Sequence, residues 1–145
     1  MRASKAHYLQ VHPGLPEPEL SFVEPFRVVV VAEIEVPNDW QYKISCWLLD
    51  TGCLYADCWG IDCDGWEQQI DDASIMYDER NETSGDHFLL TTSHGEETLA
   101  DALWFAENSA FEEYLPLDDV LILHVSIHDA ESFMRSTYEA SKTLE

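Results

Sequence analysis

Two sequence patterns alternate along this chain, and their order limits the available folds more than any other feature. The run Phe26–Ala32 is uninterrupted, apolar and rich in β-branched residues, which is typical of a strand buried on both faces. After Pro37, apolar residues recur at helical spacing until Gly52, a residue suited to ending a helix. The same pair of patterns recurs further along the chain. Strands that alternate with helices predict a parallel sheet with helical crossovers.

The expected strands and helices fill residues 26–145. The Ser93-x-x-Glu96 sequence is a capping box and predicts the start of the third helix. The expected strands cover 26–32, 53–59, 87–92 and 120–125, and the expected helices begin at 38 or 39, 64, 93 and 129. These elements predict one α/β domain with a four-stranded, mostly parallel sheet and helices on both faces. The expected architecture is flavodoxin-like or Rossmann-like.

Residues 1–25 form a separate N-terminal arm in this prediction. The stretch 13–25 is rich in proline, which excludes a regular helix or a central strand. Residues 7–11 alternate weakly, as an edge strand does. The N-terminus lacks the apolar segment of a signal peptide, and no later segment is apolar enough to cross a membrane. Because the cysteines have neither C-x-x-C nor zinc-finger spacing, we expect reduced thiols and a cytoplasmic location.

Acidic side chains dominate the charge of the chain. The sequence has 29 Asp and Glu against 7 Lys and Arg, and the only Lys or Arg between Ile44 and Met134 is Arg80. A field of this sign repels nucleic acid and anionic lipid, and it attracts basic protein surfaces. The sequence therefore predicts a basic protein partner and no direct binding to nucleic acid or membrane. The alternative is that the charge serves only solubility.

The loops that follow the expected strands hold most of the candidate binding residues. Ligands of open parallel sheets bind outside the carboxyl ends of the strands, so these loops should meet at one end of the domain. The expected surface combines tryptophan anchors with carboxylates: Asp39, Trp40, Trp59, Asp62, Asp64, Glu96 and Glu97. Such a surface suits an inhibitor of a nuclease or another nucleic-acid-binding protein. Immunity proteins of nuclease toxins and phage-encoded DNA mimics use this strategy.

The same loops could instead form the site of a small enzyme. Its candidate residues are Asp62, Cys63, His94 and Glu97. A thiolate–imidazole pair of Cys63 or Cys58 with His94 would suit acyl or thioester chemistry, although nearby carboxylates raise a thiol pKa. Carboxylates with an imidazole also suit a divalent metal, but no recognised ligand motif is present. No glycine-rich phosphate motif occurs either, and we expect no metal and no cofactor.

One histidine and three tryptophans are expected in the core. His124 lies within an apolar strand and is expected to be hydrogen-bonded to a neighbour rather than to a ligand. Trp47, Trp66 and Trp104 fall on apolar helical stripes.

Two stretches of the chain, Tyr55–Glu67 and Thr91–Ala106, resemble motifs in a family of small bacterial proteins of unknown function. The likeness extends from about Val28 to Ser126. An aromatic residue often occupies the position of Ser93 in that family, so this chain departs from the pattern there. The resemblance implies no particular activity.

Overall fold

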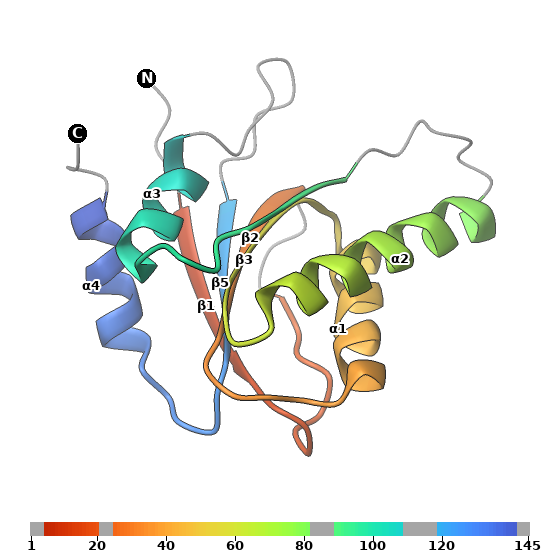
Figure 1. The fold of residues 1–145 in the computed structure, drawn as a ribbon, viewed down its shortest axis with the longest axis horizontal. Coiled ribbons are helices and arrows are strands. Elements are labelled where there is room, and N and C mark those ends of the chain that lie inside the picture. Colours follow the sequence, from red (N-terminus) through yellow and green to blue (C-terminus); the bar gives the residue numbers. More distant parts are fainter. Residues whose placement is uncertain (1–4, 21–24, 82–88, 109–118, 142–145) are drawn as a thin grey trace.

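The computed structural model describes residues 5–20, 25–81, 89–108 and 119–141. Its central feature is a five-stranded parallel sheet in the order β1-β5-β2-β3-β4 (Figure 1). The strands are β1 (Lys5–Val11), β2 (Phe26–Ala32), β3 (Cys53–Gly60), β4 (Leu90–Ser93) and β5 (Asp119–Val125). The α/β class and the parallel sheet are confirmed, but the expected number of four strands is wrong. The additional strand is β1.

β1 lies at one edge of the sheet and pairs along its whole length with β5. The parallel register runs from Lys5 opposite Asp119 to Val11 opposite Val125. β2 lies on the other side of β5, so β1 does not pair with its neighbour in sequence. A pairing between residues so far apart leaves no local signal beyond the weak alternation of the strand itself.

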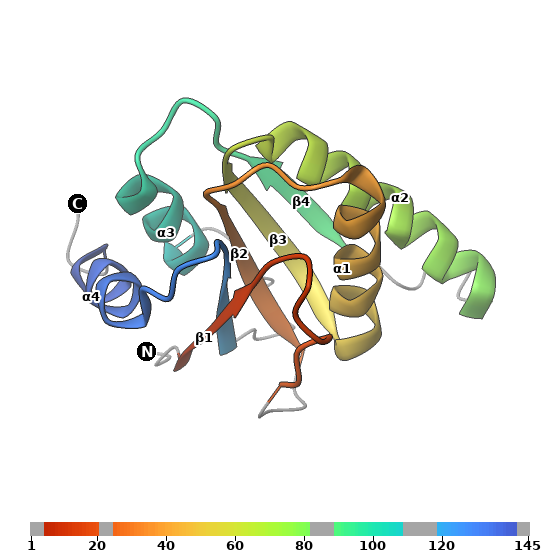
Figure 2. The same ribbon diagram turned by 90° about the horizontal axis from the view of Figure 1, so that it is seen from below.

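Helices cover both faces of the sheet, as expected. α1 (Asn38–Thr51) and α2 (Cys63–Asn81) pack on one face, and α3 (Leu99–Asn108) and α4 (Glu131–Ser141) pack on the other (Figure 2). The carboxyl end of α1 has a local cause. Gly52 ends α1 with a φ of 109°, and its N–H contacts the carbonyls of Leu48 and Leu49.

The central strand β2 contributes to two hydrophobic cores. Val28 and Val30 pack in the core under α1 and α2, whereas Val29 and Val31 pack in the core under α3 and α4. All residues of β2 are buried. This burial on both faces explains why the strand has a continuous apolar sequence rather than an alternating one.

Two helices, α3 and α4, begin later than expected, and α1 begins at Asn38 as expected but without the expected side-chain cap. Ser93 is the last residue of β4 and not a helix cap, because its hydroxyl donates to Asp64 Oδ1 at 2.8 Å. α3 begins at Leu99, and Thr98 Oγ1 accepts the backbone N–H of Asp101 at 3.1 Å. α1 is preceded by Pro37 and has no side-chain cap, while α4 begins at Glu131. The start of the expected third strand at residues 87 and 88 lies outside the described residues.

A tight turn joins β3 to α2 and sets the position of the following loop. Gly60 has a φ of 100°, and a Cβ at this position would lie 2.2 Å from the carbonyl oxygen of Ala32. The N–H of Ile61 donates to the same oxygen at 2.8 Å. A glycine is therefore required for this close approach of the two strands.

The sheet has a topological switch point between β2 and β5. β2 leads into α1 on one face of the sheet, and β5 leads into α4 on the opposite face. In open α/β sheets such a point leaves a crevice outside the carboxyl ends of the two strands. No helix within the described part of the chain is long and apolar enough to cross a membrane.

Candidate functional site

Exposed carboxylates occupy every loop that follows β2, β3, β4 and β5, and these loops meet at the carboxyl end of the parallel sheet. Lysine and arginine are absent from these four loops, whose residues are all described. Lys43 lies further along α1, and Arg135 lies one turn into α4, where its Nε donates to Glu131 Oε2 at 2.7 Å. We define the acidic surface as the exposed carboxylates of these loops and of the first residues of α2 and α4: Glu33, Glu35, Asp62, Asp64, Glu96, Glu97, Asp129 and Glu131. The expected Asp39 is also exposed, in the first turn of α1.

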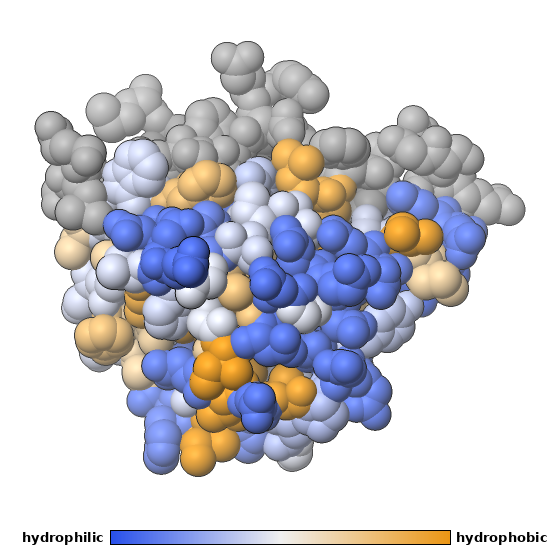
Figure 3. All heavy atoms as spheres, in the orientation of Figure 1, coloured by the Kyte–Doolittle hydropathy of each residue, from blue (hydrophilic) through white to orange (hydrophobic). Residues whose placement is uncertain are grey.

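Isoleucines rather than tryptophans are the exposed apolar residues of this surface. Ile61 is 42% exposed after β3 and Ile127 is 60% exposed after β5. Trp40 is half-buried and packs edge to face on Trp66, with ring centroids 6.0 Å apart. Trp59 is half-buried and donates its indole N–H to the carbonyl of Glu97 at 2.8 Å. The lower end of the molecule in Figure 3 shows hydrophobic residues among hydrophilic ones.

Asp62 and Asp64 have structural roles at the start of α2. Asp62 has a left-handed φ of 58° and accepts the amide N–H of Gln41 at 2.9 Å. Gly65 leaves room for the Asp62 carboxylate, because a Cβ there would lie 2.4 Å from Asp62 Oδ1. Asp64 accepts the hydroxyl of Ser93. Both carboxylates are exposed, yet their orientation is set by contacts within the chain.

His94 lies at the end of β4 in a network with two carboxylates. The ring is 5% exposed, and Nδ1 lies 2.8 Å from Glu97 Oε2. Nε2 lies 2.9 Å from the hydroxyl of Thr92 and 3.7 Å from Oδ1 of the fully buried Asp57. The bond to Asp57 raises the pKa of His94 against the opposing effect of burial, and burial raises the pKa of Asp57. The network favours a cationic imidazole ring, which the side chains of Asp57 and Glu97 flank.

The structure brings three of the four candidate enzyme residues near one another, because the Cys63 thiol lies beside the backbone of His94 and Gly95. His94 and Glu97 are bonded to each other, whereas Asp62 bonds to Gln41. Cys63 is 6% exposed, and burial followed by the charge of Asp64 raises its thiol pKa. Both ring nitrogens of His94 already have partners among Thr92, Asp57 and Glu97. The described residues contain no group of three or more His, Cys, Asp or Glu side chains placed to hold a metal.

A second network, which sequence reasoning did not assign to the site, lies at the switch point. His124 is fully buried, as expected for a core histidine. Its Nδ1 lies 2.7 Å from the hydroxyl of Tyr8, and its Nε2 bonds to Glu33 Oε1. The Tyr8 hydroxyl also accepts the N–H of Ala130 at 3.0 Å, and burial raises the pKa of Tyr8 to about 12. The only sequence signal was a histidine one residue before the end of an apolar strand.

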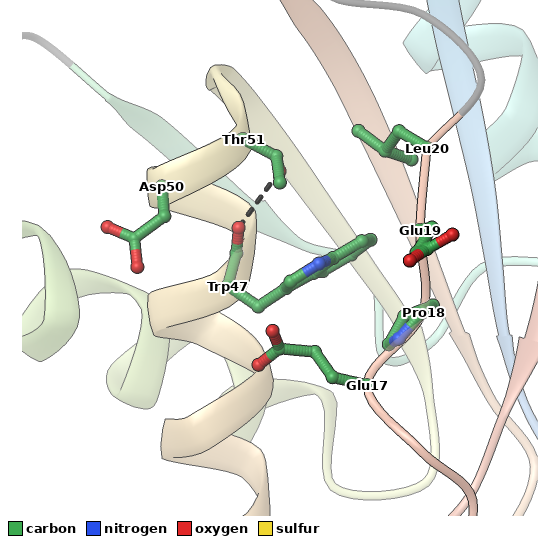
Figure 4. Close-up of a pocket in the computed structure, with 7 residues that line it drawn as sticks. All are labelled: Glu17, Pro18, Glu19, Leu20, Trp47, Asp50 and Thr51. Carbon is green, nitrogen blue, oxygen red and sulfur yellow. Dashed lines mark hydrogen bonds between the residues drawn. The ribbon is translucent and has the colours of Figure 1, made fainter.

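Two grooves of the described residues differ in their relation to the acidic surface. One of about 380 Å³ is lined by Asp129 and Glu131 of that surface together with Phe133 and Arg135 of α4. The second groove, of about 540 Å³, separates the proline-rich arm from the last turns of α1 (Figure 4). Trp47 forms part of it and is 5% exposed, and Thr51 donates to the Trp47 carbonyl at 2.9 Å. Its lining residues are Glu17, Pro18, Glu19, Leu20, Trp47, Asp50 and Thr51. The acidic surface does not line this second groove.

These features define a parallel α/β domain with an acidic surface at the carboxyl ends of its strands. The chain belongs to the family described as "Domain of unknown function (DUF7684)", whose model matches residues 6–141. The expected membership of an uncharacterised family is confirmed. The match includes β1 and the proline-rich arm as well as the rest of the sheet. No curated protein and no solved structure matches the chain.

Proposed function

We propose that this domain binds a basic protein through its acidic surface. The observation that carries the proposal is the combination of exposed carboxylates in four adjoining loops, without lysine or arginine, with the exposed side chains of Ile61 and Ile127. Opposite charge speeds the encounter of two proteins and selects the partner. Apolar contacts at the centre of an interface supply affinity once the charges have met.

Several carboxylates of the surface are held in place before any partner arrives. His94 holds Glu97, Ser93 holds Asp64, and Gln41 holds Asp62. A fixed side chain loses less conformational entropy on binding than a free one. The same contacts favour binding over catalysis at His94, because both of its ring nitrogens are engaged.

The charge of the surface also favours a particular class of partner. Proteins that bind nucleic acid present positive grooves to phosphates, and an acidic surface can occupy such a groove. We propose a nuclease or another nucleic-acid-binding effector as the partner, with inhibition or immunity as the role. A bacterial or phage origin and a cytoplasmic location belong to the same proposal, and the four free cysteines support that location.

A Rossmann-like relationship is part of the proposal as well. Without β1, the order β4-β3-β2-β5 corresponds to the order 3-2-1-4 of a Rossmann sheet. The switch point of that sheet, where ligands bind, lies between β2 and β5. This correspondence supports the acidic surface as the functional end of the domain.

Capture of partners from a bacterial lysate tests the proposal when it includes matched variants. The immobilised wild-type domain should retain a basic protein that elevated salt releases. Glu35→Lys/Glu96→Lys reverses two exposed carboxylates of the acidic surface, and Glu17→Lys/Glu19→Lys makes the same charge change on the arm. The first variant should lose the captured protein and the second should keep it. Equal capture by both variants would overturn the proposed surface.

A further inference from the structure

At the carboxyl end of the sheet, the residues that follow β5, β2 and β3 each hydrogen-bond to the last residue of a neighbouring strand. The N–H of Ser126 donates to Val11 O, that of Glu33 to Val125 O, and that of Ile61 to Ala32 O, at 3.1, 2.9 and 2.8 Å. These bonds continue the sheet ladder by one residue beyond each strand. Because strands lie about 4.8 Å apart, Glu33 sits roughly one strand spacing from Ile61 and from Ser126. Ile127 comes directly after Ser126, so the loops on either side of the Glu33 loop each carry an exposed isoleucine.

Glu33 differs from the other carboxylates of the acidic surface because a fully buried histidine of the sheet holds its carboxylate. Its Oε1 bonds to Nε2 of His124, a residue that belongs to the interior strand β5 and is fully buried. His124 is held in turn by Tyr8 on β1, so the carboxylate is fixed by two strands of the sheet. The Glu33 side chain nevertheless remains 48% exposed. Its carboxylate therefore combines a fixed direction with access from outside.

A fixed carboxylate whose two neighbouring loops carry exposed isoleucines suits arginine better than lysine. The guanidinium group is planar and forms directed hydrogen bonds to carboxylates, whereas the ammonium group of lysine is a strongly hydrated point charge. The aliphatic part of an arginine side chain can also pack on apolar neighbours while its charged end meets the acid. The carboxylate can accept such bonds beside the one from His124, because each of its oxygens has two lone pairs.

We propose that Glu33 is the anchor that receives an arginine side chain of the partner, with Ile61 and Ile127 packing on either side of it. This inference rests on the proposed function, since it names the group that the acidic surface recognises. His124 and Tyr8 are positioning residues that hold the Glu33 carboxylate. The remaining carboxylates steer the basic partner toward this point.

Titration with nona-arginine and nona-lysine peptides tests the anchor without knowledge of the natural partner. Calorimetry at low salt should show tighter binding of nona-arginine, and NMR should show shifts of the Ile61 and Ile127 methyl groups. Glu33→Gln should weaken nona-arginine binding about tenfold, as for loss of an interface hot spot. Glu35→Gln removes the same charge from the same loop and should weaken it less than about twofold.

The positioning residues are tested by the ratio of the two affinities. Tyr8→Phe removes the hydroxyl that holds His124 and should lower the preference for arginine over lysine. A purely structural role would lower both affinities together and leave that ratio unchanged. Glu33→Asp keeps the charge but shortens the side chain, so it should also lose the preference for arginine over lysine. This variant provides the test if Glu33→Gln does not fold.

The outcomes separate the anchor from the proposed function. Equal weakening by Glu33→Gln and Glu35→Gln, or equal affinity of the wild type for both peptides, would overturn the arginine anchor and leave the acidic binding surface standing. Methyl shifts confined to other parts of the domain, or an absence of salt-dependent binding by the wild type, would overturn both.

Discussion

Nε2 of His94 lies 3.7 Å from Oδ1 of Asp57, a carboxylate with no exposed surface. The bond to Asp57 raises the pKa of His94 above its ordinary value, and Glu97 adds to the shift from the opposite side of the ring. Arg27 also lies close enough to lower the pKa of Asp57, although burial raises it more strongly. The protonated ring therefore joins β3, β4 and the loop before α3.

The raised pKa of His94 predicts how the free energy of unfolding changes with pH. A histidine whose pKa is raised on folding contributes stability that is complete below its unfolded pKa of about 6.5 and is lost as pH rises through the folded value. The buried Asp57, whose pKa is also raised, disfavours the folded state further once it ionises. The urea midpoint should therefore fall as the pH rises from about 6.5 through the folded pKa of His94.

The control for this prediction is a histidine on the surface. His94→Gln should flatten the dependence on pH, whereas His128→Gln should retain it, because His128 is exposed. A wild-type midpoint that stays constant, or an identical slope in His94→Gln, would contradict the account of the network.

Replacement of Gly60 tests the close approach of β2 and β3. Gly60→Ala combines a positive φ with a Cβ at 2.2 Å from Ala32 O, and it should cost roughly 2–4 kcal/mol of unfolding free energy. Gly14→Ala is the matched control, since it shares a positive φ of 104° but meets nothing within 4 Å. That control should cost about 1 kcal/mol. Equal losses in chemical denaturation would mean that the contact with Ala32 is unimportant.

Two alanine substitutions test which residue starts α3. Thr98→Ala should cost about 1 kcal/mol, because it removes the oxygen that accepts the Asp101 N–H. Ser93→Ala should cost only about 0.5 kcal/mol, because the hydroxyl bonds to the exposed Asp64. The reverse order of the two losses, measured by urea unfolding, would support the capping box at Ser93 instead.

Thiol labelling tests whether Cys63 is a reactive nucleophile. Cys46 is half-buried, whereas Cys53, Cys58 and Cys63 are buried and have raised pKa values. Iodoacetamide at neutral pH should therefore modify Cys46 first, and the other three only as the protein unfolds. Rapid modification of Cys63 in the folded protein, located by mass spectrometry, would favour the thiol enzyme over the binding protein.

The sequence predicted the parts of the fold that local patterns determine. β2 is buried on both faces and was recognised from its apolar run, and Gly52 ends α1 as expected. β1 received only a weak indication because its pairing with β5 joins distant parts of the chain. The predicted capping box at Ser93 is wrong, because the serine hydroxyl donates a hydrogen bond to Asp64 of α2. Local sequence does not reveal such a tertiary partner.

The candidate site was predicted in its general position but not in its details. The rule for parallel sheets correctly brought the acidic loops to one end of the domain. It could not show that Trp40 would pack on Trp66, or that a histidine of the core would hold Glu33. Both contacts depend on which side chains face each other across elements, and a single sequence carries no record of that.

The most direct test of the account is the affinity of the purified complex with the captured basic partner, measured at low and at physiological ionic strength. We predict a Kd that rises steeply with salt for the wild type, and a weakening of at least about tenfold in Glu35→Lys/Glu96→Lys. Glu17→Lys/Glu19→Lys, which has the same net charge, should bind nearly as well as the wild type. A Kd that does not depend on salt, or an equal loss in both variants, would contradict recognition through the acidic surface.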